Sequence, residues 1–147
     1  MSWLSRLKAA RGGAQALSAQ AEQTLRTWHA LPDAVLDHPH FESRYVVVNT
    51  EATGLDLDSD RLLAVGAVGV DGGLLHPTDA YYATLDPAPG EALAGLLGVV
   101  GKSPLVVFNA SFNRSMLERA LNEPLGLVPS FVWIALYFLL PSLFLEK

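Results

Sequence analysis

Short apolar runs separated by polar turns occupy the middle of the chain, and they predict the strands of a sheet. Tyr45–Val48 is a β-branched run bounded by polar residues, which is typical of a central strand. Residues 61–70 predict a second strand, and residues 74–85 predict a third that Pro77 interrupts, as at an edge or a bulge. The turn between them contains Gly72-Gly73, which favours a tight hairpin. The three strands are therefore expected to form an antiparallel meander.

A helix, a strand and another helix are predicted after the meander. Residues 91–100 have helical character, which Gly95 and Gly98 weaken. Residues 104–108 are again a compact apolar run of the strand type, and from Phe112 onward apolar residues recur at helical spacing. The order β-β-β-α-β-α, followed by an apolar terminal helix, predicts an α/β fold. In it, a parallel strand extends the meander through a crossover helix.

The N-terminal part of the chain differs in character from this middle part. Apolar residues within positions 1–8 have helical spacing, and a second helix is expected over residues 14–30 before a linker at 32–39. We therefore divide the chain into a helical N-terminal extension with a linker, residues 1–40, and a domain over residues 41–147.

The C-terminal run, residues 125–145, carries no charge and is the strongest candidate for a membrane span. Pro129 and Pro141 bracket residues 130–140, however, and an apolar segment of that length is typical of a buried helix. A membrane anchor is the minor alternative. A further alternative is a homodimer or a partner protein bound through residues 125–145, because the run carries several aromatic side chains. These are Phe131, Trp133, Phe138 and Phe144.

Composition narrows the classes of function. The chain has 147 residues, of which 50% are hydrophobic and 17% charged, and this is enough apolar material for the core of one globular domain. The formal net charge of −5 argues against a broad basic surface for a nucleic-acid backbone, although a small local site is compatible with it. The sequence has no cysteine, which excludes disulfides, thiolate zinc sites and a cysteine nucleophile.

The strongest candidate chemistry lies at the end of the first strand. Asn49 and Glu51 are two positions apart, so in an extended chain their side chains project to the same side. Two acids at this spacing commonly hold a divalent metal, but here one member is an amide. Thr53-Gly54-Leu55 then forms a turn where the backbone is able to approach a ligand and Leu55 is able to pack against a flat one.

This segment resembles the first motif of the DEDD 3′–5′ exonucleases of the proofreading epsilon-subunit type. In that family the motif reads Asp-x-Glu-x-Thr-Gly-Leu, and residues 49–55 read Asn-x-Glu-x-Thr-Gly-Leu. Residues 61–68, Arg-Leu-Leu-Ala-Val-Gly-Ala-Val, resemble the strand that follows it in the family.

A second motif of the family also has a counterpart. Residues 105–113 resemble its strand-to-helix segment, which ends in Phe-Asp where this chain has Phe112-Asn113, and residues 117–121 resemble the helix that follows. Beyond it, Ala135 stands where relatives often carry Asp. The resemblance implies an RNase H-like mixed sheet flanked by helices, in a cytoplasmic protein of bacterial type. It makes five residues candidates for substrate binding: Thr53, Gly54, Leu55, Asn109 and Phe112.

The resemblance supports the fold of the family, but the catalytic positions of this chain differ from those of the family. The family uses carboxylates to hold two divalent ions, Mg²⁺ or Mn²⁺, together with a His or Tyr that activates water. Of the catalytic motif positions Asn49, Glu51 and Asn113, only Glu51 keeps a carboxylate, and it is expected to hold a metal weakly if at all. The third motif is expected several tens of residues further on, beyond Lys147, so the resemblance implies a degenerate domain that is truncated at its C-terminus.

Three hypotheses follow for the function. The first is an exonuclease-like domain that is catalytically impaired, needs no cofactor, and keeps weak binding of single-stranded nucleic acid or a nucleotide. The second is a regulatory module that self-associates through its apolar C-terminal face. The third is an active exonuclease, dependent on Mg²⁺ or Mn²⁺, which a missing C-terminal segment completes. Taken singly, Asn49 and Asn113 also suit a backbone hydrogen bond or a helix cap, and Glu51 an ordinary exposed position.

Overall fold

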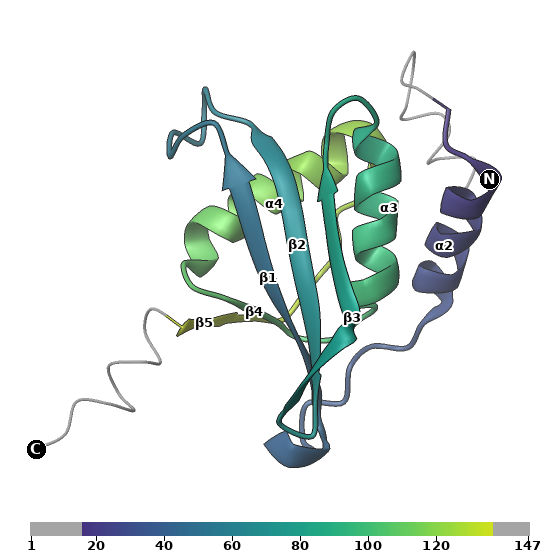
Figure 1. Ribbon diagram of the computed structural model, residues 1–147, viewed down its shortest axis with the longest axis vertical. Coiled ribbons are helices and arrows are strands. Elements are labelled where there is room, and N and C mark those ends of the chain that lie inside the picture. Colours follow the sequence, from purple (N-terminus) through teal and green to yellow (C-terminus); the bar gives the residue numbers. More distant parts are fainter. Residues whose placement is uncertain (1–15, 137–147) are drawn as a thin grey trace, which may run out of the picture.

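The computed structural model describes residues 16–136, which fold around a five-stranded sheet (Figure 1). The strands are β1 (Arg44–Ala52), β2 (Leu62–Asp71), β3 (Leu74–Thr84), β4 (Leu105–Val107) and β5 (Trp133–Ala135). Their order across the sheet is β3-β2-β1-β4-β5. Strands β1, β2 and β3 pair antiparallel, and β4 and β5 extend the sheet from β1 in the parallel direction.

The helices of the described chain are α2 (Ala19–Ala30), α3 (Pro89–Val100) and α4 (Ala110–Leu125), and the short 3-10 helix η1 (His40–Glu42) precedes β1. Helix α3 packs on β2 and β3, α4 contacts β2 and β5, and α2 packs on α3. In Figure 1, α4 passes behind the strands, and no described helix covers the sheet face toward the viewer. The predicted α/β architecture, a mixed sheet with an antiparallel meander and a parallel extension flanked by helices, is confirmed.

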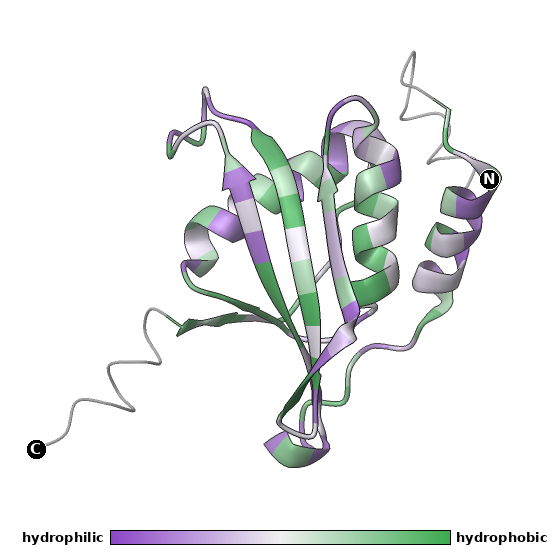
Figure 2. Ribbon diagram, viewed as in Figure 1, coloured by the Kyte–Doolittle hydropathy of each residue, from purple (hydrophilic) through white to green (hydrophobic). Residues whose placement is uncertain are grey.

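Alternation along β1 sends its side chains to two different faces of the sheet. Val46 and Val48 are buried in the core beneath the helices, whereas Asn49 and Glu51 are exposed. Figure 2 shows the result as a hydrophilic end of β1 beside a more hydrophobic β2. The core draws fully buried side chains from α2, the sheet, α3 and α4, including Leu25, Val65, Leu97, Leu105 and Leu121.

Two glycine positions explain how the meander and α3 fit together. Gly72 and Gly73 have φ values of 59° and 77° and form the predicted hairpin turn between β2 and β3, where the left-handed backbone favours glycine. Gly95 faces Tyr81 of β3, and a Cβ added at Gly95 would lie 2.3 Å from the Tyr81 hydroxyl oxygen. That hydroxyl donates a hydrogen bond of 2.7 Å to the main-chain oxygen of Ala92. The glycine that weakens the helical pattern therefore lets α3 approach the sheet.

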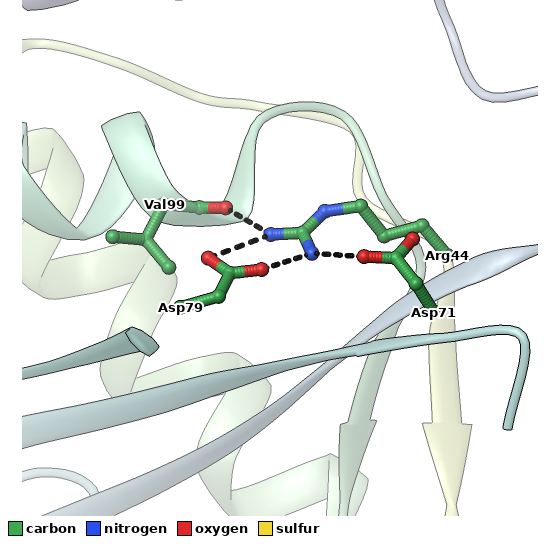
Figure 3. A network of polar contacts seen from close by, with 4 residues as sticks. All are labelled: Arg44, Asp71, Asp79 and Val99. Atoms are coloured by element: carbon green, nitrogen blue, oxygen red, sulfur yellow. Dashed lines mark hydrogen bonds and ion pairs between the residues drawn. The ribbon is translucent and has the colours of Figure 1, made fainter. Parts of the chain in front are cut away.

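A polar network ties the strands together at the end where β1 begins (Figure 3). The Arg44 guanidinium binds the Asp79 carboxylate, donates a hydrogen bond of 2.8 Å to the main-chain oxygen of Val99, and lies 3.2 Å from the Asp71 carboxylate. A Cβ at Gly69 would lie 2.3 Å from an Arg44 nitrogen, so the network also depends on the missing side chain there. These contacts join β1, β2, β3 and the end of α3.

The C-terminal part of the described chain differs from what its sequence predicts. A buried helix was expected over residues 130–140, but residues 133–135 form β5, which pairs with β4. A short apolar run satisfies a buried parallel strand as well as a buried helix, and the partner strand β4 decides between them. None of the described helices is long and apolar enough to cross a membrane. Phe131 and Trp133 meet edge to face at 6.1 Å and pack against the core.

Several predictions concern residues beyond the described range. The helix expected within positions 1–8, the start of the helix expected at residue 14, and the side chains of Phe138 and Phe144 all lie outside it. Helix α2 is described from Ala19, with the Ser18 side chain accepting a hydrogen bond from the Ala21 amide as its cap. Because Leu25 and Trp28 of α2 are buried in the same core as the sheet, α2 is packed as part of one body with it.

Candidate functional site

The end of β1 brings the first candidate residues to an open part of the surface. Asn49 and Glu51 are both exposed, and they share a face of the strand because side chains alternate. Strand pairing places Gly66 opposite Asn49 and Ala64 opposite Glu51, so small β2 residues flank them on that face. The expected extended strand through Asn49 and Glu51 is confirmed.

Asn113 reaches β1 from the helix-covered side. Its Oδ1 accepts a hydrogen bond of 2.5 Å from the Thr50 hydroxyl, and its Nδ2 donates one of 2.7 Å to the main-chain oxygen of Asn109. Thr50 lies between Asn49 and Glu51 in the strand, so alternation places its side chain on the face opposite to theirs. All three motif positions therefore lie at one end of β1, but Asn113 contacts Thr50 on the face of the sheet opposite to that of Asn49 and Glu51.

Asn109 and Phe112 have structural roles at the start of α4. The Asn109 side-chain oxygen accepts a hydrogen bond of 3.3 Å from the Phe112 amide, which makes Asn109 the N-cap of the helix. Phe112 is half-buried and packs against the core. Asn109 is exposed and stays accessible, whereas most of the Phe112 ring is committed to packing.

The loop after β1 is held together by the carboxylate of Asp60. One of its oxygens accepts a hydrogen bond of 2.7 Å from the Thr53 hydroxyl, and the other accepts one of 2.8 Å from the Asp56 amide. Gly54 lies against this carboxylate, and an added Cβ would stand 2.4 Å from Asp60 Oδ2. Thr53 and Gly54 thus belong to a closed loop, and their residue types follow from its internal contacts.

A turn at the tip of the same loop lowers the pKa of the Asp56 carboxyl group. Asp56 Oδ1 accepts hydrogen bonds from the amide of Asp58, at 2.9 Å, and from the amide of Ser59, at 3.4 Å. The hydrogen bond from the Asp58 amide is the main reason that the pKa of Asp56 is lowered from its ordinary value, and Ser59 adds to it. The same hydrogen bonds close the turn around Asp56.

Exposed apolar side chains stand beside these polar groups. Leu55, at the tip of the loop, is 84% exposed, and Phe108, which follows β4, is 60% exposed. Val47 pairs with Val106 across β1 and β4, and Asn49 and Phe108 each follow two residues later. On the basis of this register and of the chain order after β1, we group residues of the loop, β1 and the β4–α4 junction under one name, the β1-end surface: Asn49, Glu51, Thr53, Gly54, Leu55, Phe108 and Asn109.

The β1-end surface offers few groups for a metal ion. Glu51 is its only carboxylate, and within residues 16–136 no three His, Cys, Asp or Glu side chains gather as they would around a metal. An amide oxygen is able to coordinate Mg²⁺, but it adds no charge to offset the loss of the ion's water shell. Glu51 alone is a poor donor set for a resident divalent cation.

Sequence patterns did not reveal three residues that shape this region. Thr50 lies between two motif positions and carries no signal of its own in the sequence, although it makes the contact with Asn113. Asp60 has a weak signal, since Asp and Ser are enriched in loops that bond their own backbone. Arg119 of α4 donates hydrogen bonds to the main-chain oxygens of Leu57 and Asp60, and no local pattern could predict a contact between segments so far apart in sequence.

Comparisons with known proteins find similarity only among solved structures, and at low sequence identity. No family model matches the sequence, and no curated protein matches it. Among solved structures, E. coli exonuclease I in complex with a dT13 oligonucleotide aligns with 12% identity and a TM-score of 0.48. The alignment covers 69% of this chain and 29% of that chain. An exonuclease I complex with SSB-Ct aligns with 11% identity and a TM-score of 0.46, over 69% of this chain and 30% of that chain. This chain thus spans less than a third of the proteins it aligns with.

Proposed function

We propose that this chain binds the 3′ end of a single nucleic-acid strand at the β1-end surface and does not hydrolyse it. The proposal rests on the resemblance of residues 49–55 and 105–113 to the two exonuclease motifs, and on the meeting of both segments at one end of β1. The exonuclease I structures in the comparison include oligonucleotide complexes, a ligand of the class proposed here.

The proposed lack of hydrolysis is supported mainly by the Asn113 side-chain amide, whose oxygen and nitrogen are both hydrogen-bonded within the chain. It uses its oxygen to accept from Thr50 and its nitrogen to donate to Asn109, so both ends serve internal hydrogen bonds. An ionised carboxylate at this position has no proton to donate to the Asn109 oxygen. The contacts of position 113 therefore suit an amide, and among the motif positions 49, 51 and 113 only Glu51 offers a carboxylate to a reaction that depends on paired metal ions.

Binding without a metal depends on apolar contacts with bases. Leu55 and Phe108 expose apolar surface beside the motif positions, and stacking of a base on an aromatic side chain contributes about 1–3 kcal/mol. Phosphate contacts contribute little, because Glu51, Asp56 and Asp58 place negative charge near the site. We therefore expect a Kd on the order of 10⁻⁴ M, at the weak end of non-specific binding, with a small salt dependence.

Titration of an isotope-labelled chain with a short oligothymidine in EDTA tests the location of this site by NMR. The expected result is saturable perturbation of amides in residues 49–55 and 108–113, without perturbation near Arg44 at the opposite end of β1. The variant Phe108→Ala should weaken binding roughly tenfold, if one base stacks on the ring. Phe41→Ala is the matched control, since Phe41 is 69% exposed in η1 and precedes the other end of β1.

Two outcomes of this titration would contradict the proposal. The absence of any saturable perturbation at millimolar oligothymidine would remove the binding site. Equal loss of affinity in Phe108→Ala and Phe41→Ala would show that binding is a general property of exposed aromatic side chains and is not confined to the β1-end surface.

A further inference from the structure

Helix α4 contacts the end of β1 and the loop that follows it at two points along the helix. Near its start, Asn113 accepts the hydrogen bond from Thr50 of β1. Six residues later, Arg119 donates hydrogen bonds to the main-chain oxygens of Leu57 and Asp60 in the loop after β1. At about 1.5 Å per residue the two contact points are about 9 Å apart along the helix axis. One helix thus fixes both the strand end and the loop.

We infer that Arg119 is a positioning residue, which orders the loop of residues 53–61 and thereby sets the affinity of the β1-end surface for a nucleic-acid strand. The inference rests on the proposed function for its ligand. Arg119 is half-buried and lies behind the loop, where it lines a cavity with Asp60, Leu62 and Met116. It acts on a ligand only through the loop that carries Gly54 and Leu55.

A chain of hydrogen bonds through Asp60 connects Arg119 to the part of the loop that carries Thr53 and Asp56. Arg119 holds the main-chain oxygen of Asp60, while the Asp60 carboxylate holds the Thr53 hydroxyl and the Asp56 amide. The Thr53 hydroxyl in turn accepts a hydrogen bond of 3.0 Å from the Arg61 amide. Release of the loop carbonyls by Arg119 would therefore free the segment that presents Leu55, which makes few contacts of its own at 84% exposure.

The chemistry of the contact requires arginine. Two nitrogens of the guanidinium reach two different carbonyl oxygens, which the rigid fork of arginine allows and the single ammonium of lysine does not reproduce. The Arg119 Nη2 also lies 3.5 Å from the sulfur of Met116, so the side chain is confined from behind. Arg119→Lys keeps the charge and removes the fork, which separates geometry from electrostatics.

The experiment combines amide hydrogen exchange with binding. Arg119→Ala and Arg119→Lys are compared with Arg114→Ala, a control on the same helix whose 58% exposed side chain pairs with Glu118 at 2.8 Å. The exchange rates of the loop amides of Asp56 and Arg61 are measured beside that of the buried strand residue Val48. Affinity is measured by anisotropy of a short 5′-labelled oligothymidine in EDTA.

Arg119→Ala is expected to raise the exchange rates of the loop amides about tenfold and leave that of Val48 unchanged, since local opening is independent of global unfolding. The Kd should rise roughly fivefold to tenfold, which corresponds to a released loop that is ordered only about a tenth to a fifth of the time, since the apparent Kd is the intrinsic Kd divided by that fraction. Arg119→Lys should fall between Arg119→Ala and the wild type. Arg114→Ala should match the wild type in both measurements.

Each contrary outcome has a distinct meaning. Wild-type loop exchange rates in Arg119→Ala would overturn the inference whether or not the oligonucleotide binds. Faster loop exchange with an unchanged Kd would overturn the link between loop order and affinity, and equal acceleration at Val48 would assign Arg119 to global stability. Absence of binding by the wild type would refute the proposed function, and the exchange data would still decide whether Arg119 orders the loop.

Discussion

Substitution of Gly54 by alanine tests the loop geometry at the candidate site. Gly54 has no positive φ, so the backbone itself accepts alanine, and only the space beside it is limiting. The added Cβ would lie 2.4 Å from Asp60 Oδ2, and ordinary contact begins at 3.4 Å, so the carboxylate must retreat by about 1 Å. Its hydrogen bonds to Thr53, at 2.7 Å, and Asp56, at 2.8 Å, would not survive a retreat of that size.

The expected cost is the loss of these two hydrogen bonds to a charged acceptor. In the exposed loop each contributes at the low end of the usual range, so Gly54→Ala should destabilise the fold by about 1–2 kcal/mol. That corresponds to a Tm lower by about 3–8 °C for a domain of this size. Urea denaturation followed by circular dichroism measures the change in the free energy of unfolding directly.

A double-mutant cycle with Asp60→Ala provides the control. Asp60→Ala removes the same two hydrogen bonds and also removes the obstacle, so Gly54→Ala added to that background should cost nothing. A gain of about 0.4–1 kcal/mol is expected there, because alanine restricts the unfolded chain more than glycine does. Additive costs of the two substitutions would refute the reasoning, since they would show that Gly54 and Asp60 do not compete for the same space.

Two further predictions concern the packing of the helices. Burial, with a smaller contribution from the charge of Glu91, raises the pKa of Tyr81 above 10.0. The protonated phenol therefore contributes stability that is fully present below about pH 10 and is lost as the pH rises through the folded-state pKa. In urea denaturation, the free energy of unfolding of Tyr81→Phe should therefore vary less with pH between pH 8 and 11 than that of the wild type. Trp28 is 5% exposed and its Nε1 donates a hydrogen bond of 2.8 Å to the main-chain oxygen of Gly101, so Trp28→Ala should lower the free energy of unfolding by about 3–5 kcal/mol in the same assay. An unchanged urea midpoint in Trp28→Ala would show that α2 does not stabilise the sheet.

The meander could be predicted from the sequence because its information is local. The β-branched run at Tyr45–Val48 and the Gly72-Gly73 turn each specify structure over a few neighbouring residues, and both predictions are confirmed. Residues 130–140 carried no such information: their uniform apolar character suits a helix or a buried strand, and only pairing with β4 made residues 133–135 a strand.

The candidate site was likewise predictable only where its structure depends on neighbouring residues in the sequence. Residues 49–55 could be singled out from their spacing, and their position at the end of β1 follows from it. The contacts that shape them come from distant segments, Asn113 for Thr50 and Arg119 for the loop. A sequence separation of 63 residues between Thr50 and Asn113 leaves no periodicity to read, so which face of the sheet Asn113 approaches had to come from the structure.

The central claim is that the chain binds a single strand without hydrolysing it. The most direct test measures the anisotropy of a 5′-labelled oligothymidine with the wild-type chain, first in EDTA and then with Mg²⁺ or Mn²⁺. The length of the strand is determined by electrophoresis afterwards. The account predicts one saturable curve, unchanged by the metal ion, and a strand that stays at full length. Absence of saturation would contradict binding at the β1-end surface. Shortening of the strand from its 3′ end in the presence of the metal would contradict the loss of hydrolysis.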